Sequence, residues 1–174
     1  HKESGPARRK DKPMSHQAAP GEDHHRVDRG KKLKHNSLND LYSKEWIKFQ
    51  KSWFIHNPPP RTRKVKVHPA KFPEDLIEEF IRFFTKSGQA VLDPMAGTGS
   101  TLIAAVRSGR CGYGIELQEK YADIARQRIA DTAEQCDDPP EWQLETANAA
   151  EYDYTRLPEI YYCITSPPYW DMLR

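Results

Sequence analysis

The strand–turn–helix pattern of residues 90–107 limits the fold of this chain more than any other segment. An apolar run ends in Asp93, a turn with Gly97 and Gly99 follows, and an apolar helix is predicted from Thr101. Glycines let the backbone turn tightly and approach a ligand, and the N-terminus of a helix favours polar or anionic groups. The same pattern also occurs in units that bind nothing, so its meaning depends on the segments that follow.

Three more strands and two more long helices are predicted downstream and upstream of this unit. The strands are expected at residues 112–116, 142–146 and 160–165, and the helices at 74–86 and 119–135. Strands that alternate with helices of this length predict an α/β fold with a parallel sheet. No apolar run is long enough to span a membrane.

Polar residues stand at the end of each predicted strand. Asp93 ends the first, Glu116 the second, and Asn148 and Ser166 follow the third and fourth. Ligands of parallel α/β sheets lie at the carboxyl ends of the strands, and an acidic residue at the end of the second strand is where ribose hydroxyls are held. We therefore expect these four residues to share one ligand site.

The stretch Ser166-Pro167-Pro168-Tyr169 follows the last predicted strand. Each proline fixes φ near −65° and removes a backbone N–H, so the corner is rigid and poor in donors. Its carbonyls are free to accept hydrogen bonds, and the tyrosine supplies a flat wall. Such a corner suits a planar base with an exocyclic amine, although a proline-rich turn that merely closes a strand is the alternative.

Together these segments resemble one known family. Asp93-Pro94-Met95-Ala96-Gly97-Thr98-Gly99-Ser100 resembles motif I of the S-adenosylmethionine-dependent amino-methyltransferases of DNA, and Ser166-Pro167-Pro168-Tyr169 resembles their catalytic motif IV. Residues 68–74 resemble motif X, which helps to bind the cofactor. In that family Ser-Pro-Pro-Tyr usually accompanies N4-cytosine methylation, whereas Asp- or Asn-Pro-Pro-Tyr usually accompanies N6-adenine methylation.

The resemblance implies a Rossmann-like methyltransferase sheet, S-adenosylmethionine as cofactor, and no metal. It assigns the catalytic role to Ser166, Pro167, Pro168 and Tyr169. It assigns cofactor binding to Lys71, Asp93, Pro94, Ala96, Gly97, Gly99, Glu116 and Asn148. At Asn148 the chain departs from the family, whose members often carry a Gly-Asp-Ala-like turn near the adenine.

The implied chemistry is methyl transfer to an amine whose lone pair is delocalised into the ring. The Ser166 hydroxyl and a carbonyl next to Pro167 would accept hydrogen bonds from the amine, and Tyr169 would stack on a base flipped out of double-stranded DNA. A carbon-5 cytosine methyltransferase would instead need a cysteine nucleophile. The chain has no Pro-Cys dipeptide, and Cys163 is expected inside a buried strand.

Charge and composition divide the chain into three segments. Residues 1–36 are predicted to be a disordered basic arm, residues 37–67 an aromatic helix with a basic connector, and residues 68–174 the methyltransferase domain. Lys and Arg far outnumber Asp and Glu up to residue 67 and are outnumbered after it, so the net charge is only +2. A basic arm fits a DNA partner, although a merely solvated tail has the same composition. The aromatic stripe of Trp46, Phe49 and Trp53 is expected to pack on the domain.

The sheet is expected to be incomplete, with about four of the family's seven strands. We therefore expect an N-terminal portion of a larger or split enzyme, with a second polypeptide supplying the remaining strands and target recognition. The three cysteines form no close-spaced pair, which favours a reducing setting and a cytoplasmic, DNA-associated protein.

The leading hypothesis is a site-specific DNA methyltransferase that acts on N4 of cytosine within a restriction–modification system. One alternative is an N6-adenine or RNA amino-methyltransferase with the same core. Another, of a different class, is an inactive cofactor-binding or nucleic-acid-binding subunit of a split enzyme.

Overall fold

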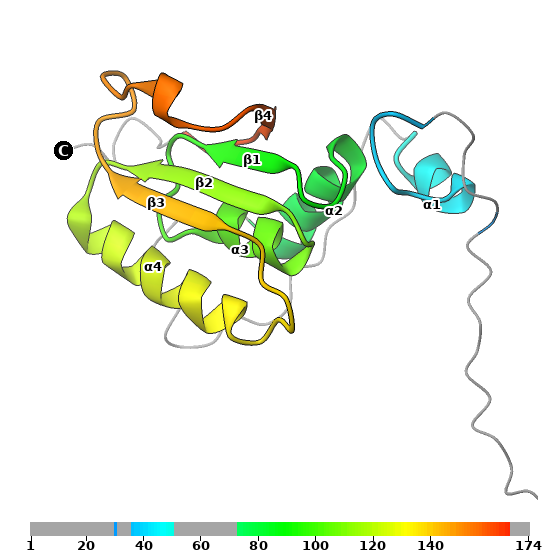
Figure 1. Ribbon diagram of the computed structural model, residues 1–174, viewed down its shortest axis with the longest axis horizontal. Coiled ribbons are helices and arrows are strands. Elements are labelled where there is room, and N and C mark those ends of the chain that lie inside the picture. Colours follow the sequence, from blue (N-terminus) through cyan, green and yellow to red (C-terminus); the bar gives the residue numbers. More distant parts are fainter. Residues whose placement is uncertain (1–29, 31–35, 51–72, 168–174) are drawn as a thin grey trace, which may run out of the picture.

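A computed structural model describes residues 30, 36–50 and 73–167 of the chain (Figure 1). Its strands are β1 (Ala90–Asp93), β2 (Cys111–Glu116), β3 (Trp142–Thr146) and β4 (Ile160–Cys163). They form one parallel sheet with the order β3-β2-β1-β4. The α/β class is confirmed, and a strand lies at each of the four predicted places.

Some sequence predictions fall on residues outside the described ranges. They are the disordered arm, the basic connector that ends at Val67, Lys71 of motif X, and Pro168 and Tyr169 of the proline corner. These stay predictions, as do the boundaries of the three proposed segments.

The order of the strands creates a switch point between β1 and β4. From β1 the chain moves outward through β2 to β3, and it then returns to pair β4 with the opposite side of β1. The carboxyl ends of the strands lie at the left of Figure 1, where the arrowheads point. A crevice at such a switch point is the usual ligand site of an open α/β sheet.

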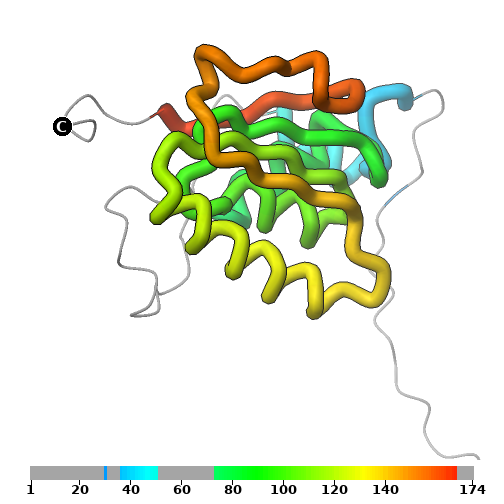
Figure 2. Tube along the Cα trace, turned by 60° about the vertical axis from the view of Figure 1, so that its left-hand side comes forward, coloured from blue at the N-terminus to red at the C-terminus, as the bar shows by residue number. Residues whose placement is uncertain are grey.

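Three helices lie side by side on one face of the sheet (Figures 1 and 2). They are α2 (Glu74–Phe84), α3 (Ser100–Arg107) and α4 (Glu119–Ala133), close to the bounds predicted from the sequence. α3 lies in the middle and packs against both neighbours, so every residue from Ser100 to Val106 is buried. Ile77 and Ile81 of α2 are fully buried against β1 and α3, as the apolar face of that helix predicts.

The opposite face of the sheet is covered by the connection between β3 and β4. This connection contains a single 3₁₀ turn, Tyr154–Arg156. Leu157, just after it, packs on Leu92 and Tyr113, which point away from the three helices. Burial and the nearby Glu141 carboxylate raise the pKa of Tyr113 to about 12.

The N-terminal part of the described chain packs on α2 through aromatic rings. α1 (Ser43–Lys48) carries Trp46, whose ring centroid lies 4.8 Å from that of Phe83. Phe49 stacks on the same Phe83 ring, with 4.6 Å between centroids. The packing role predicted for the aromatic stripe is therefore confirmed for these two residues, whereas Trp53 lies outside the described ranges.

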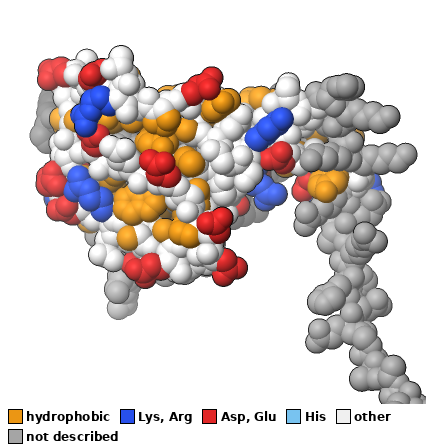
Figure 3. All heavy atoms as spheres, viewed as in Figure 1, with side chains coloured by type: hydrophobic (Ala, Val, Ile, Leu, Met, Phe, Trp, Pro, Cys, Tyr) orange, Lys and Arg blue, Asp and Glu red, His pale blue; other side chains and the backbone are white. Residues whose placement is uncertain are grey.

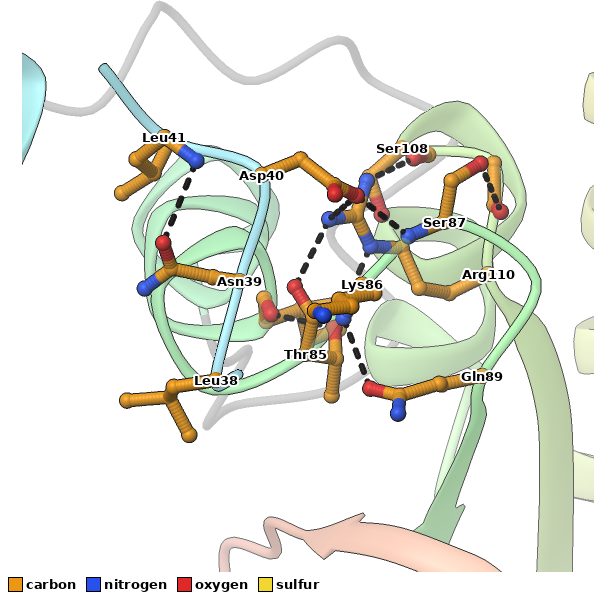
Figure 4. A network of polar contacts seen from close by, with 12 residues as sticks. Leu38, Asn39, Asp40, Leu41, Thr85, Lys86, Ser87, Gln89, Ser108 and Arg110 are labelled. Atoms are coloured by element: carbon orange, nitrogen blue, oxygen red, sulfur yellow. Dashed lines mark hydrogen bonds and ion pairs between the residues drawn. The ribbon is translucent and has the colours of Figure 1, made fainter. Parts of the chain in front are cut away.

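The helix predicted to begin at Ser37 begins instead at Ser43. Residues before it are engaged elsewhere, because the side chain of Asn36 accepts from two backbone N–H groups and that of Asp40 accepts from the N–H of Ser87 (2.8 Å). Asp40 also lies 3.8 Å from the buried guanidinium of Arg110 (Figure 4). The local turn at Asn36 and the long-range contact of Asp40 thus keep the residues before Ser43 out of the helix.

Arg110 is the centre of this contact. Its guanidinium donates to the hydroxyl and the carbonyl of Thr85, at 3.1 and 2.9 Å, and to the carbonyl of Ser108 (Figure 4). Burial lowers the pKa of Arg110, and the charge of Asp40 raises it again in part. The Asp40–Arg110 contact fixes the N-terminal segment at the amino ends of β1 and β2, which is the edge opposite the switch point.

Candidate functional site

Asp93 ends β1 and supports the turn that follows it. The side chain is 3% exposed. Its carboxylate accepts hydrogen bonds from the Met95 N–H (3.0 Å) and from the Thr101 hydroxyl at the start of α3. Burial raises the pKa of Asp93, while the hydroxyl dipoles of Thr101 and Thr165 and the N–H of Met95 partly lower it. Asp93 therefore ties the end of the strand to the beginning of the helix.

The two glycines of the turn have different surroundings. Both have positive φ, +54° at Gly97 and +83° at Gly99. Among the described residues, no atom lies within 4 Å of a Cβ placed at Gly97, whereas a Cβ at Gly99 would lie 3.0 Å from Cβ of Ala125 and 3.2 Å from Cδ1 of Ile129. Gly97 thus borders open space in which a ligand could lie, and Gly99 allows the turn to pack on α4.

Glu116 ends β2 and is 8% exposed. Its Oε2 accepts from the Gly97 N–H (2.8 Å) and its Oε1 from the Gln118 N–H (2.9 Å). The carboxylate therefore links the glycine turn that follows β1 to the residue that precedes α4. It lies beside the open position at Gly97, as a residue that holds ligand hydroxyls would.

Asn148 lies on the same edge, after β3. The Ala147 N–H donates to the carbonyl of Glu116 (3.0 Å), which places the following residue next to the end of β2. The exposed Asn148 side chain accepts from the Ala150 N–H (3.1 Å) and closes a local turn. The strand-end pattern of the sequence thus brings Asp93, Glu116 and Asn148 to one edge.

The chain after β4 lies across the switch point from Asp93. The Ile164 N–H donates to the carbonyl of Leu92 (3.0 Å) and continues the pairing with β1. The Thr165 hydroxyl is buried and faces the Asp93 carboxylate, whose pKa it lowers by hydrogen bonding, although the geometry between the two groups falls outside that of a well-formed hydrogen bond. Ser166 and Pro167 follow as exposed residues. A buried hydroxyl this weakly bonded is free to serve a ligand at the same edge.

The remaining residues of motif I line the approach to the turn. Ala96 is buried, and its N–H donates to the carbonyl of Ile115 (2.8 Å), while Pro94 is half-buried. Sequence reasoning did not select Met95 and Leu117, which are apolar yet 43% and 60% exposed at the ends of β1 and β2. An apolar residue within two positions of a strand-terminal acid was the available signal, and both side chains could contact a planar ligand.

Cys163 differs from its prediction. It is exposed at the end of β4, whereas a buried position had been expected. The alternating strand puts its side chain beside Leu92 on the thinly covered face. Desolvation and the charge of Asp93 raise the pKa of this thiol, which opposes formation of the thiolate that a cysteine nucleophile needs.

The described ranges hold neither a metal cluster nor a membrane span. No three or more His, Cys, Asp or Glu side chains of residues 36–50 and 73–167 are grouped so as to hold a metal ion. Among the helices of those same ranges, none combines the length and apolar character needed to cross a membrane.

Relatives of known kind share this part of the chain. The orphan methyltransferase M.BamHII of Bacillus amyloliquefaciens is 34% identical over 109 residues, which is 61% of this chain and 40% of that protein. The type II methyltransferase M.ScaI of Streptomyces caespitosus is 45% identical over 62 residues, 36% of this chain and 20% of that protein. The chain therefore spans less than half the length of these relatives.

A solved structure is also similar. It is that of a proposed DNA modification methylase from Thermus thermophilus in complex with S-adenosyl-L-methionine, 42% identical, with a TM-score of 0.37 over 44% of this chain and 30% of that one. The profile of the DNA methylase family N6_N4_Mtase matches residues 8–127, more than half of the sequence. The chain therefore belongs to the N6/N4 family of DNA methylases.

Proposed function

We propose that this chain forms the cofactor edge and the target-base corner of a site-specific DNA methyltransferase acting on the N4 amine of cytosine. One arrangement carries the proposal: the open position at Gly97 lies beside Glu116, and Ser166 follows β4 across the switch point. Family membership supports methylation of DNA. The likeness to a type II methyltransferase supports a restriction–modification setting.

The residues of this edge fit S-adenosylmethionine. Glu116 can accept hydrogen bonds from ribose hydroxyls, and the open space at Gly97 admits a ligand against the backbone. When bound, the cofactor supplies a methyl group on a positively charged sulfur. We assign its amino-acid part to Asp93 and the turn at the N-terminus of α3, and its adenine to the neighbourhood of Asn148. Pro94, Ala96, Gly99 and Lys71 complete the proposed cofactor set.

The target base belongs at the proline corner. The Ser166 hydroxyl and a carbonyl next to Pro167 would accept hydrogen bonds from the amine, which draws its nitrogen toward tetrahedral geometry and fixes its approach. The amine would take the methyl group as the bond between methyl and sulfur breaks, which would leave a neutral thioether, and one amine proton would pass to water. Pro168 would keep the corner rigid, and Tyr169 would stack on the base after it is flipped out of the duplex.

The choice of cytosine over adenine depends on the serine at the head of this corner. DNA is the proposed partner because the residues up to Val67 are strongly basic and phosphate contacts supply affinity that is independent of sequence. The domain face in Figure 3 instead shows acidic side chains scattered among basic and hydrophobic ones. We therefore assign the phosphate contacts to the N-terminal segment.

The proposal includes a second polypeptide or chain segment beside β4. Within residues 73–167, β4 pairs only with β1, so its other edge can accept a further strand. A heavier complex by light scattering after co-expression with a candidate partner would support a separate polypeptide, and an active monomer would contradict it.

The test uses the full-length protein, S-adenosylmethionine with a labelled methyl group, and unmethylated DNA and RNA offered in parallel. N4-methylcytosine in DNA is the expected product. N6-methyladenine alone would refute the base assignment, and label only in RNA would refute the DNA partner. Ser166→Ala is the matched variant, expected to lower kcat at least about tenfold without a change in cofactor affinity.

A further inference from the structure

Arg128 of α4 reaches the glycine turn. Its guanidinium donates through one Nη to the backbone carbonyl of Thr98, with the Thr98 hydroxyl 3.3 Å from the same nitrogen. Its other Nη donates to Oε1 of Glu74, the first residue of α2. Both side chains of this ion pair are largely buried, with exposures of 22% for Arg128 and 14% for Glu74.

Glu74 binds a second arginine with its other oxygen. Nη1 of Arg107, at the end of α3, lies 3.2 Å from Oε2 of Glu74. Arg107 is 48% exposed and ends α3, whose opposite end adjoins the glycine turn. One carboxylate therefore joins α2, α3 and α4, but only its contact with Arg128 continues to the glycine turn.

The contact with Arg128 adds a hydrogen bond to the Thr98–Gly99 peptide, which lies in a permissive part of the backbone. Thr98 lies between two glycines of positive φ, which are the most permissive residues of the backbone. The Gly99 N–H donates to the carbonyl of Ala96 (2.8 Å), and the guanidinium holds the carbonyl of the same peptide from the other side. The Gly97 N–H is held by Glu116. The turn is thus held from three directions, and Arg128 is its contact with the helices.

We propose that Arg128, oriented by Glu74, is a positioning residue that keeps the Gly97–Gly99 turn in the shape that accepts the cofactor. This inference rests on the proposed function of that turn. It explains how Glu74, the last residue of the motif X stretch, acts on the cofactor site through another side chain. A planar guanidinium can serve a carbonyl and a carboxylate at once, which a lysine ammonium on a flexible stem cannot do with the same geometry.

The test measures the Kd of S-adenosylhomocysteine by calorimetry and the melting temperature of the full-length protein. Arg128→Met is expected to weaken binding about tenfold, in the range of a hydrogen bond to a charged group. Arg107→Met is the matched control, because it also removes a partner of Glu74 without touching the turn. Arg107→Met should change Kd less than about twofold, even if it lowers the melting temperature as much as Arg128→Met does.

Two more variants separate positioning from stability. Arg128→Lys keeps the charge opposite Glu74 and is expected to fold, yet to weaken binding about threefold or more. Glu74→Gln should weaken binding alone but add little in the Arg128→Met background, because both residues act through one contact. The cofactor KM should rise in these variants while kcat changes little.

The possible results have distinct meanings. Wild-type affinity in folded Arg128→Lys and Arg128→Met variants would overturn the inference. Additive effects of the Glu74 and Arg128 substitutions would overturn the link between them. If Arg128→Met does not fold, the affinity of Arg128→Lys decides the question. Failure of the wild-type protein to bind S-adenosylhomocysteine would instead refute the proposed cofactor site itself.

Discussion

The carboxylate of Glu116, at the end of β2, accepts a hydrogen bond from the backbone N–H of Gly97 in the turn after β1 (2.8 Å). Two neighbouring strand ends are therefore joined by a side chain that is also proposed to hold the ribose. A ligand hydroxyl could still donate to the second lone pair of Oε2, and would then share this atom with the Gly97 N–H. The shape of the turn and ligand binding are thus linked at one atom.

Glu116→Gln should damage binding more than folding. A glutamine can accept only one of the two N–H groups that the carboxylate now serves, so we expect a loss of about 1 kcal/mol in unfolding free energy. Cofactor affinity should fall about tenfold or more, as measured by calorimetry. Glu119→Gln is the control, since that carboxylate is exposed and pairs with Arg126. Equal effects of both substitutions on Kd would contradict the role of Glu116.

Gly97→Ala and Gly99→Ala should separate ligand contact from packing. At Gly99 the methyl group would collide with Ala125, so we expect a loss of about 1–3 kcal/mol in urea unfolding. At Gly97 it would enter open space, and only backbone strain of about 1 kcal/mol is expected. Cofactor affinity of a folded Gly97→Ala variant should nevertheless fall about tenfold. Unchanged affinity would place the ligand elsewhere.

Asp93 should make stability fall as pH rises. Its pKa is raised above 3.8 by burial, so the folded state binds the proton more tightly than the unfolded state. Its contribution to stability is complete below pH 3.8 and is lost as pH rises through the raised pKa. Asp93→Asn does not titrate, so its unfolding free energy relative to the wild type should increase across that window. Urea unfolding at several pH values measures this difference, and a difference that shrinks with rising pH would be contrary.

Thr165→Val tests the buried hydroxyl that faces Asp93. Valine has nearly the same shape, and because the Thr165 hydroxyl makes no well-formed hydrogen bond within the described residues, its removal should change the unfolding free energy by less than about 1 kcal/mol. If the hydroxyl serves the ligand site, kcat or cofactor affinity should fall in the same variant. A destabilised variant with full activity would show that the hydroxyl has a structural partner.

The fold was largely predictable because its signals are local. Apolar runs that end in Asp93 and Glu116, with glycines between strand and helix, indicate both elements and their order. The contact of Arg128 with Thr98 was not predictable, because the two residues are far apart in sequence and meet only after α4 packs on the turn. The same reason hid the true start of α1, since Asp40 binds Ser87 and Arg110 across the fold.

Cys163 shows a second limit of the sequence. A strand was correctly predicted there, but which of its faces is covered depends on the connection after β3, and that segment has no periodicity to read. Likewise, Gly97 and Gly99 look equivalent in the motif. They differ only after α4 packs on the turn, because Ala125 then lies against Gly99 while Gly97 stays open.

The Asp40–Arg110 contact also has a mechanical consequence. It anchors the N-terminal segment at the amino edge of the sheet, while Asp93 and Glu116 stand at the carboxyl edge, and the stiff hydrogen-bonded strands separate the two. A displacement of that segment would act first on the loop before β1, which Asp40 contacts, and not on the edge that carries Asp93 and Glu116. The residues at the amino edge of the sheet can therefore change in evolution while the geometry of the carboxyl edge stays the same.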